Sequence, residues 1–173
     1  FKVLTRLGLY RRQPTSNLEL LSTEAKGSMG GEGAAFFLLT DKKSDENQAE
    51  LNSIKTLYNI DDIPTGIIKF LAENNLKPED IDLLITGKNG DLKNDAVYKQ
   101  LAASIFKNNN VGNYKHLSGE YSTSSSFALW LAANIAKKEL IPQKVIERQI
   151  KYKAPKKVLI YNHYLNKYHS LML

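Results

Sequence analysis

The chain has 173 residues, of which 42% are hydrophobic and 24% charged, as in a globular domain that can bury a core. It contains no cysteine, which excludes a disulfide framework, a thiolate metal site and a cysteine nucleophile within this chain. The net charge of +6 comes from scattered lysines without the interleaved aromatic residues of a nucleic-acid module. We therefore expect no nucleic-acid partner.

The sequence also bears on location and cofactors. It has no signal peptide and no apolar run of membrane-spanning length, which predicts a cytoplasmic protein. The three histidines, His116, His163 and His169, lack the helical spacing of metal ligands, and we expect neither a metal nor a cofactor. The chain begins at Phe1 with residues typical of the middle of a protein, so we expect a fragment of a longer one.

The first half of the chain predicts a strand, a helix and a second strand. Residues 30–40, GGEGAAFFLLT, pass from small to large apolar side chains, which is typical of a buried strand. Residues 48–58 fit either a short amphipathic helix or an extended edge segment. Apolar residues at helical spacing predict a helix up to Asn74 that opens at residues 63–65, and residues 81–85 predict a buried strand.

Polar residues follow that second strand. Residues 86–92 are rich in glycine and asparagine and predict a loop at the carboxyl end of the strand. A helix is expected to begin at Asn94 or Asp95. Residues 114–118 are expected to form a short extended connection to the next element.

The stretch at residues 119–138, GEYSTSSSFALWLAANIAKK, predicts the helix around which the fold is organised. Residues 127–136 are apolar at almost every position, so the helix is expected to be buried on all sides. It is too short to cross a bilayer. The hydroxyls at residues 122–126 are expected to cap its first turn, where the free N–H groups also favour negative charge.

The end of the chain predicts a hairpin. After Pro142, residues 144–153 fit either a loop or an edge strand. Residues 158–161 predict a strand, residues 162–167 a turn, and residues 168–173 a last strand antiparallel to it.

Together these elements predict one α/β domain over residues 1–173, with a mixed β-sheet, outer helices and a buried central helix. A helix covered on both sides needs a second layer, and the chain scarcely has enough strands to form one. A partner half is therefore implied.

Four motifs in this order resemble the C-terminal half of a β-ketoacyl synthase, a condensing enzyme of the thiolase-like fold. Residues 31–35, GEGAA, are similar to a family strand, and residues 77–86, KPEDIDLLIT, to the segment before the first active-site loop. Residues 115–133 are similar to the family's KxxxGHxxGASG turn and buried helix. Asn162 and the final hairpin stand in the place of the NSFGFGGTN stretch.

The resemblance implies where the active-site positions lie. The family's cysteine nucleophile belongs to the N-terminal half, which this chain lacks. The family's first histidine falls on Gly87, the aspartate of its loop on Asp95, and a following glutamate on Tyr98. The second histidine falls on Glu120, and the lysine five residues before it is kept as Lys115.

These departures weaken the expected chemistry. In the family the two histidines donate hydrogen bonds to the thioester oxygen, whereas glycine has no donor and an ionised carboxylate repels a developing oxyanion. The glycines of the family's GFGG turn are also missing at residues 165–168. His116 lies nearby, but using it would shift the helix by a turn. We expect Lys115 and Glu120 to form an internal ion pair that holds the loop.

Three hypotheses follow. In the first, the chain is half of a non-condensing subunit, similar to the chain-length factors of polyketide and polyene synthases, that pairs with an active ketosynthase and an acyl carrier protein. In the second, the protein is an active acyltransferase of fatty acid or polyketide biosynthesis that uses Lys115, Glu120 or the hydroxyls at residues 122–126. In the third, it is an acyl-binding or scaffold domain. The resemblance also implies a homodimer or a heterodimer with an active ketosynthase.

Overall fold

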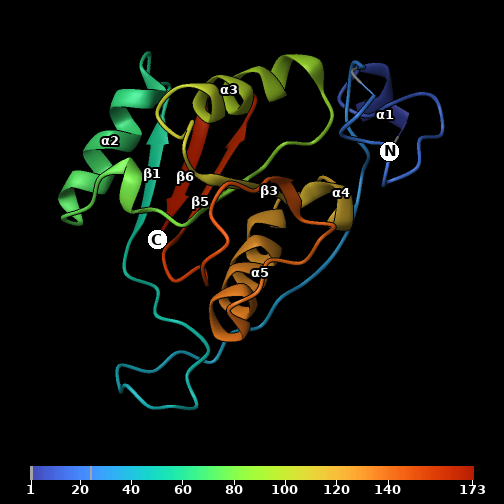
Figure 1. The fold of residues 1–173 in the computed structure, drawn as a ribbon. Coiled ribbons are helices and arrows are strands. Elements are labelled where there is room, and N and C mark those ends of the chain that lie inside the picture. The colour runs from blue at the N-terminus through green and yellow to red at the C-terminus, as the bar shows by residue number, and fades with distance from the viewer. Residues whose placement is uncertain (1, 24) are drawn as a thin grey trace.

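A computed structural model of the chain describes residues 2–23 and 25–173. These residues form five α-helices and a six-stranded sheet (Figure 1). The helices are α1 (Lys2–Arg6), α2 (Ile63–Glu73), α3 (Leu92–Ala103), α4 (Lys115–Ser118) and α5 (Ser124–Lys138). The strands are β1 (Ile54–Tyr58), β2 (Leu83–Thr86), β3 (Asn110–Asn113), β4 (Ile146–Arg148), β5 (Val158–Tyr164) and β6 (Tyr168–Met172).

The sheet is open and mixed, with the strand order β1-β6-β5-β2-β3-β4. Strand β2 lies parallel to both β3 and β5, and the other neighbours pair antiparallel. The β5–β6 hairpin is therefore inserted between β1 and β2, although it comes last in the chain. The α/β class and the mixed sheet predicted from the sequence are confirmed.

The side chains of the central strands alternate between two cores, one on each face of the sheet. Leu84 points into the core formed with α2 and α3, whereas its neighbours Leu83 and Ile85 point into the core formed with α5. In Figure 1, α2 and α3 lie over one face and α5 over the other. This explains why β2 is apolar at consecutive positions.

Helix α5 is buried along one face only. Ala128 and Ile135 are buried against the sheet, whereas Trp130 on the other side is 47% exposed. The prediction of burial on all sides is wrong for this chain, because no second layer in the described residues covers the outer face. The helix begins at Ser124, and its N-cap residue Thr123 makes no side-chain cap, so the predicted hydroxyl cap is wrong too.

Residues 30–40 do not form the predicted buried strand. They are extended, but Phe36 is 96% and Leu38 100% exposed. Their backbone pairing is limited to an isolated parallel bridge between Gly30 and Glu120, in which the N–H of Gly31 donates to the carbonyl of Glu120 at 3.1 Å. The prediction of a buried strand is wrong, because the described part of the chain contains no strand that pairs with this segment and no layer that covers it.

Several boundaries agree with the sequence analysis. Residues 48–58 were predicted to be either a helix or an extended segment, and they contain strand β1. Residues 144–153 were predicted to be either a loop or an edge strand, and they contain strand β4. Helix α2, strand β2 and strand β6 lie within two residues of their predicted positions.

Other boundaries were wrong. Residues 115–118 form the short helix α4 instead of an extended connection, and strand β3 was not predicted because asparagines stand at both its ends. Their side chains are satisfied by hydrogen bonds, for example from Thr86 Oγ1 to Asn113 Oδ1. Strand β5 continues through the predicted turn to Tyr164, and two residues in the left-handed region, Leu165 and Asn166, make a tight hairpin.

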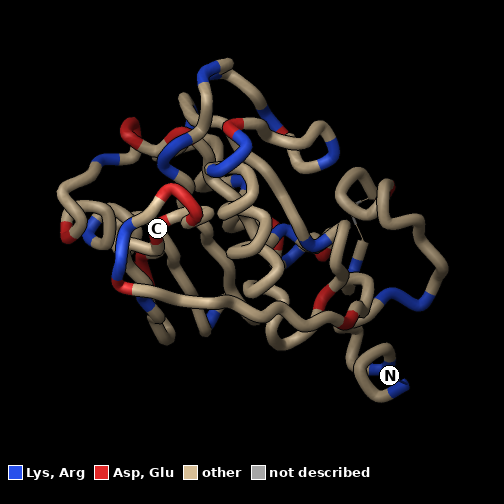
Figure 2. The backbone as a smooth tube through the Cα atoms, turned by 90° about the horizontal axis from the view of Figure 1, so that it is seen from below, with Lys and Arg blue, Asp and Glu red and all other residues tan. Residues whose placement is uncertain are grey.

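The excess of positive charge has no single location. Lys and Arg positions are scattered along the whole backbone, with Asp and Glu positions between them (Figure 2). No helix in the described part of the chain is long and apolar enough to cross a membrane.

Candidate functional site

The candidate site lies where strand β2 ends and its loop turns into helix α3. Residues 88–91 of this loop are buried, and Asp91 caps α3 by accepting from the N–H of Asn94 at 2.9 Å. The helix thus begins two residues before the predicted start, because Asp91 is the cap. Loops at the carboxyl ends of parallel strands are common places for ligands in α/β sheets.

Asp95 holds this loop from inside. Its carboxylate accepts from the backbone N–H groups of Asn89 at 2.9 Å and Gly90 at 2.8 Å. Burial raises the pKa of Asp95 to about 6, although these two hydrogen bonds favour the ionised form. The position that the resemblance assigned to a loop aspartate therefore has a structural role: it fixes the backbone of the loop.

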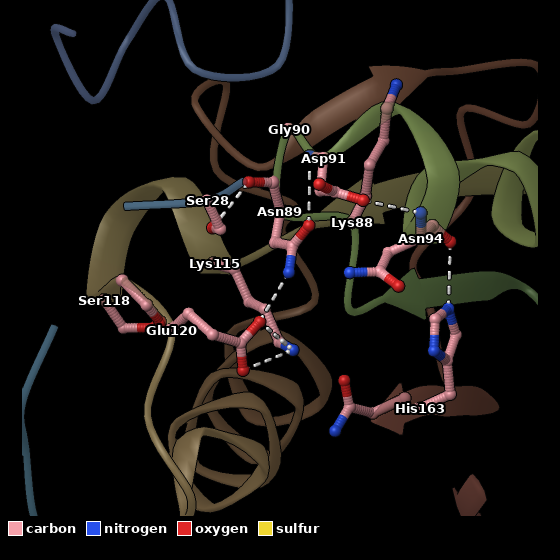
Figure 3. Close-up of polar contacts among 12 residues, drawn as sticks. Ser28, Lys88, Asn89, Gly90, Asp91, Asn94, Lys115, Ser118, Glu120 and His163 are labelled. Carbon is pink, nitrogen blue, oxygen red and sulfur yellow. Dashed lines mark hydrogen bonds and ion pairs between the residues drawn. The ribbon is translucent and has the colours of Figure 1, made fainter. Parts of the chain in front are cut away.

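Lys115 and Glu120 form the predicted ion pair. Lys115 Nζ lies 3.0 and 2.7 Å from the two carboxylate oxygens of Glu120, and the side chains are 2% and 19% exposed. Asn89 Nδ2 donates to the same carboxylate at 2.6 Å, and Figure 3 shows Asn89 directed at Glu120. Burial lowers the pKa of Lys115, and Glu120 opposes this shift.

The space beside Gly87 is filled by other side chains. A Cβ atom at this position would lie 2.1 Å from Asn162 Oδ1 and 2.7 Å from Tyr98 Oη. Asn162 comes from strand β5 and Tyr98 from helix α3, so two elements meet at this glycine. A larger residue at 87 therefore requires both neighbours to move.

His163 lies next to this group and is fully engaged. Its Nδ1 accepts from the backbone N–H of Asn166 at 3.2 Å, so Nε2 carries the proton and donates to the carbonyl of Asn94 at 2.9 Å. Figure 3 shows the ring pointing at Asn94 and away from Glu120. Burial lowers the pKa of His163 to about 4, so the ring is neutral at physiological pH.

A segment from the N-terminal part of the chain covers the loop. Ser28 Oγ donates to the carbonyl of Asn89 at 2.7 Å, and the N–H of Gly27 donates to Asp91 Oδ2 at 2.5 Å. Arg11 crosslinks the segment to the loop through four backbone carbonyls, which belong to Leu20, Thr23, Gly27 and Gly90. No pattern in the sequence predicted this cover, because residues 1–28 have no clean periodicity.

The predicted site positions therefore come together. Asn89 contacts both Asp95 and Glu120, Glu120 contacts Lys115, and Gly87 precedes Asn89 by two residues in the same loop.

No protein-family model, no curated protein and no solved structure matches this chain. Among residues 2–23 and 25–173, no cluster of three or more histidine, aspartate or glutamate side chains could hold a metal ion.

Most of the polar groups at the site are paired with one another. The Glu120 carboxylate is neutralised by Lys115, and both ring nitrogens of His163 are occupied. The neutral amide of Asn162 is partly exposed beside them. The sequence did not predict roles for Asn89 or His163. The only signal for Asn89 was a loop rich in glycine and asparagine after a buried strand.

Proposed function

We propose that this chain is one half of a subunit that resembles a β-ketoacyl synthase of fatty acid or polyketide biosynthesis but does not itself condense acyl groups. In this proposal a second half, similar to the N-terminal half of such enzymes, covers the chain. The subunit pairs with an active ketosynthase, receives acyl groups from an acyl carrier protein and shapes the pocket for the growing chain.

The proposal rests on which residues occupy the two positions where the resemblance places histidines. Gly87 has no side chain, and its space is filled by Asn162 and Tyr98. Glu120 presents a carboxylate that is already held by Lys115 and Asn89. Neither position supplies an imidazole N–H.

This arrangement is poor for condensation. Decarboxylative condensation needs donors aimed at a thioester oxygen that gains negative charge, and the loss of one such donor typically lowers the rate about 10²–10³-fold. A carboxylate at Glu120 adds repulsion in place of a donor. His163 does not compensate, because its only N–H is directed at the carbonyl of Asn94.

The open surfaces support the proposed second half. The outer face of α5 exposes Trp130, and the extended segment at residues 31–40 exposes Phe36 and Leu38. The chain that follows this segment contacts the C-terminal end of α5, where Lys137 Nζ donates to the carbonyl of Asp45 at 2.6 Å (Figure 1). Exposed apolar side chains that lie together generally mark contacts with another layer of protein.

An activity assay on the intact protein that contains this chain tests the proposal. Malonyl and acyl groups are supplied on an acyl carrier protein, and β-ketoacyl product is measured with the protein alone and with a separately purified active ketosynthase added. We expect no product from the protein alone and a changed product length with the ketosynthase. Turnover by the protein alone would instead support the active acyltransferase. Failure to bind any acyl group would support the scaffold domain.

A further inference from the structure

We propose that the side-chain amide of Asn162 is a hydrogen-bond donor for the carbonyl oxygen of a bound acyl thioester. The inference rests on the proposed function, because that function supplies the acyl ligand. It adds a residue outside the positions that the sequence analysis singled out as an active site.

The orientation of the amide follows from the donors around it. The backbone N–H of His163 donates to Tyr98 Oη at 3.0 Å, so the hydroxyl must place its own proton elsewhere. The acceptor in reach is Asn162 Oδ1, at a long 3.5 Å. The oxygen of the amide therefore faces Tyr98. Its two N–H groups have no hydrogen-bond partner among the described residues.

Gly87 provides the room for this arrangement. The amide oxygen of Asn162 stands 2.1 Å from the point where a Cβ atom of residue 87 would lie. The resemblance assigns that position to a histidine that donates to the thioester. Asn162 therefore occupies the volume next to that position from a different strand, and it carries a neutral donor in place of an imidazole.

The surroundings favour a neutral carbonyl over an anion. The Lys115 ammonium is already paired with Glu120, and the carboxylate of Asp95, in the first turn of α3, accepts from the backbone N–H groups of the loop. The Lys115 charge also contributes to the low pKa of His163, the residue next to Asn162, which places the ion pair and the amide in one region. The other ammonium near the loop, that of Lys88, is paired with Glu147, so a carboxylate or phosphate ligand would gain little from either lysine. A thioester carbonyl needs only a neutral donor.

The amide is also accessible to a ligand. Asn162 is partly exposed, whereas its neighbours Tyr161 and His163 on strand β5 are buried. One neutral donor binds a carbonyl without supplying the charge stabilisation of a full oxyanion site. The inference thus fits a subunit that holds an acyl chain and leaves it unreacted.

Infrared spectroscopy on the intact protein provides the test. The probes are octanoyl groups, ¹³C-labelled at the carbonyl, on an acyl carrier protein and on coenzyme A. A hydrogen bond lowers the stretching frequency of the carbonyl, so we expect a shift to lower frequency on binding to the wild type. The shift should be lost in Asn162→Ala. Binding of the carrier-protein probe alone indicates a thioester delivered by the carrier protein. Binding of the coenzyme A probe indicates a free thioester.

Affinity supplies the matched comparison. Asn162→Asp replaces two donors by acceptors at constant size and should raise the dissociation constant of the octanoyl thioester at least about tenfold. Asn108→Asp makes the same change at an exposed residue with no contacts to the site and should leave the dissociation constant unchanged. Circular dichroism of each variant checks that it is folded.

The outcomes separate the two proposals. If the wild type binds neither octanoyl probe, the proposed function fails and the role of Asn162 fails with it. If the wild type binds a probe but Asn162→Ala leaves the carbonyl frequency and the affinity unchanged, the role of Asn162 alone is overturned. Loss of both the shift and the affinity in the Asn162 variants supports it.

Discussion

The ammonium of Lys115 lies 2.7 and 3.0 Å from the two carboxylate oxygens of Glu120, and both residues flank the turn that leads into helix α5. Lys115 is almost completely buried, so this pair is the main source of opposite charge for an ammonium that has left water. A buried pair of this kind is costly to break, because the remaining charge has no solvent to stabilise it. The pair therefore fixes the turn.

The first prediction concerns this pair. Glu120→Gln should destabilise the protein by about 3–5 kcal/mol, because it leaves the Lys115 charge buried without its partner. Lys115→Met should cost less, since Glu120 is partly exposed and keeps its hydrogen bond from Asn89. The double variant should be more stable than Glu120→Gln alone. Urea unfolding measures all three. A Glu120→Gln variant within about 0.5 kcal/mol of wild type would show that the pair has no structural role.

The second prediction concerns Gly87. Gly87→Ala should destabilise by about 1–3 kcal/mol, because the added methyl group overlaps Asn162 and Tyr98. The matched control is Gly33→Ala, where the added Cβ meets only the hydroxyl end of Tyr121 at an exposed position. That substitution should change stability by less than about 0.5 kcal/mol. Equal effects of the two substitutions would mean that the space beside Gly87 is open.

The third prediction concerns pH between 4 and 6. Asp95 has a folded-state pKa of about 6 against an ordinary value of 3.8, so the folded protein keeps a proton that the unfolded chain releases. Its contribution of about 3 kcal/mol to the free energy of unfolding is fully present below pH 3.8 and is lost as the pH rises to 6. His163 acts in the opposite direction. Its pKa falls from 6.5 to about 4, so its contribution of about 3 kcal/mol is present above pH 6.5 and is lost as the pH falls to 4.

The two effects should nearly cancel in the wild type and separate in single variants. Relative to wild type, stability in Asp95→Asn should rise more steeply from pH 4 to 6, because only the histidine effect remains. Stability in His163→Gln should fall over the same range. Urea midpoints at four pH values measure both slopes. Variants whose pH profiles run parallel to the wild type would contradict the assignment of these two groups.

The fourth prediction concerns the segment that covers the loop. Arg11 donates to four backbone carbonyls, and the single ammonium of a lysine cannot reproduce this fork. Arg11→Lys should therefore increase limited proteolysis within residues 12–31. Arg12→Lys is the control, because Arg12 is exposed. Identical cleavage patterns in the two variants would show that Arg11 does not anchor the segment.

Much of the fold was predictable because the apolar pattern is local. Strand β2 is a continuous apolar run because it contacts a core on each face of the sheet. The apolar residues of α2 follow helical spacing because only one face of this helix is buried. The sequence analysis failed where burial depends on other parts of the protein. Residues 30–40 and the outer face of α5 have the composition of buried elements, but nothing in the described part of the chain covers them.

The sequence indicated which positions lie near one another, but not the contacts between them. The resemblance selected Gly87, Asp95, Lys115 and Glu120, and the structure brings their loop and turn together through Asn89. The role of Asn162 could not be read from the sequence, because it depends on an absent side chain at residue 87 and on a hydroxyl from helix α3. Such contacts join residues up to 75 positions apart and leave no local pattern.

The most direct test of the central claim is a condensation assay on the intact protein that contains this chain. The assay supplies malonyl and acyl groups on an acyl carrier protein and measures β-ketoacyl product by mass spectrometry. We predict binding of the acyl group and no product unless an active ketosynthase is added. Product formed at a rate comparable to that of an active synthase, by the protein alone, would contradict the claim that this subunit does not condense.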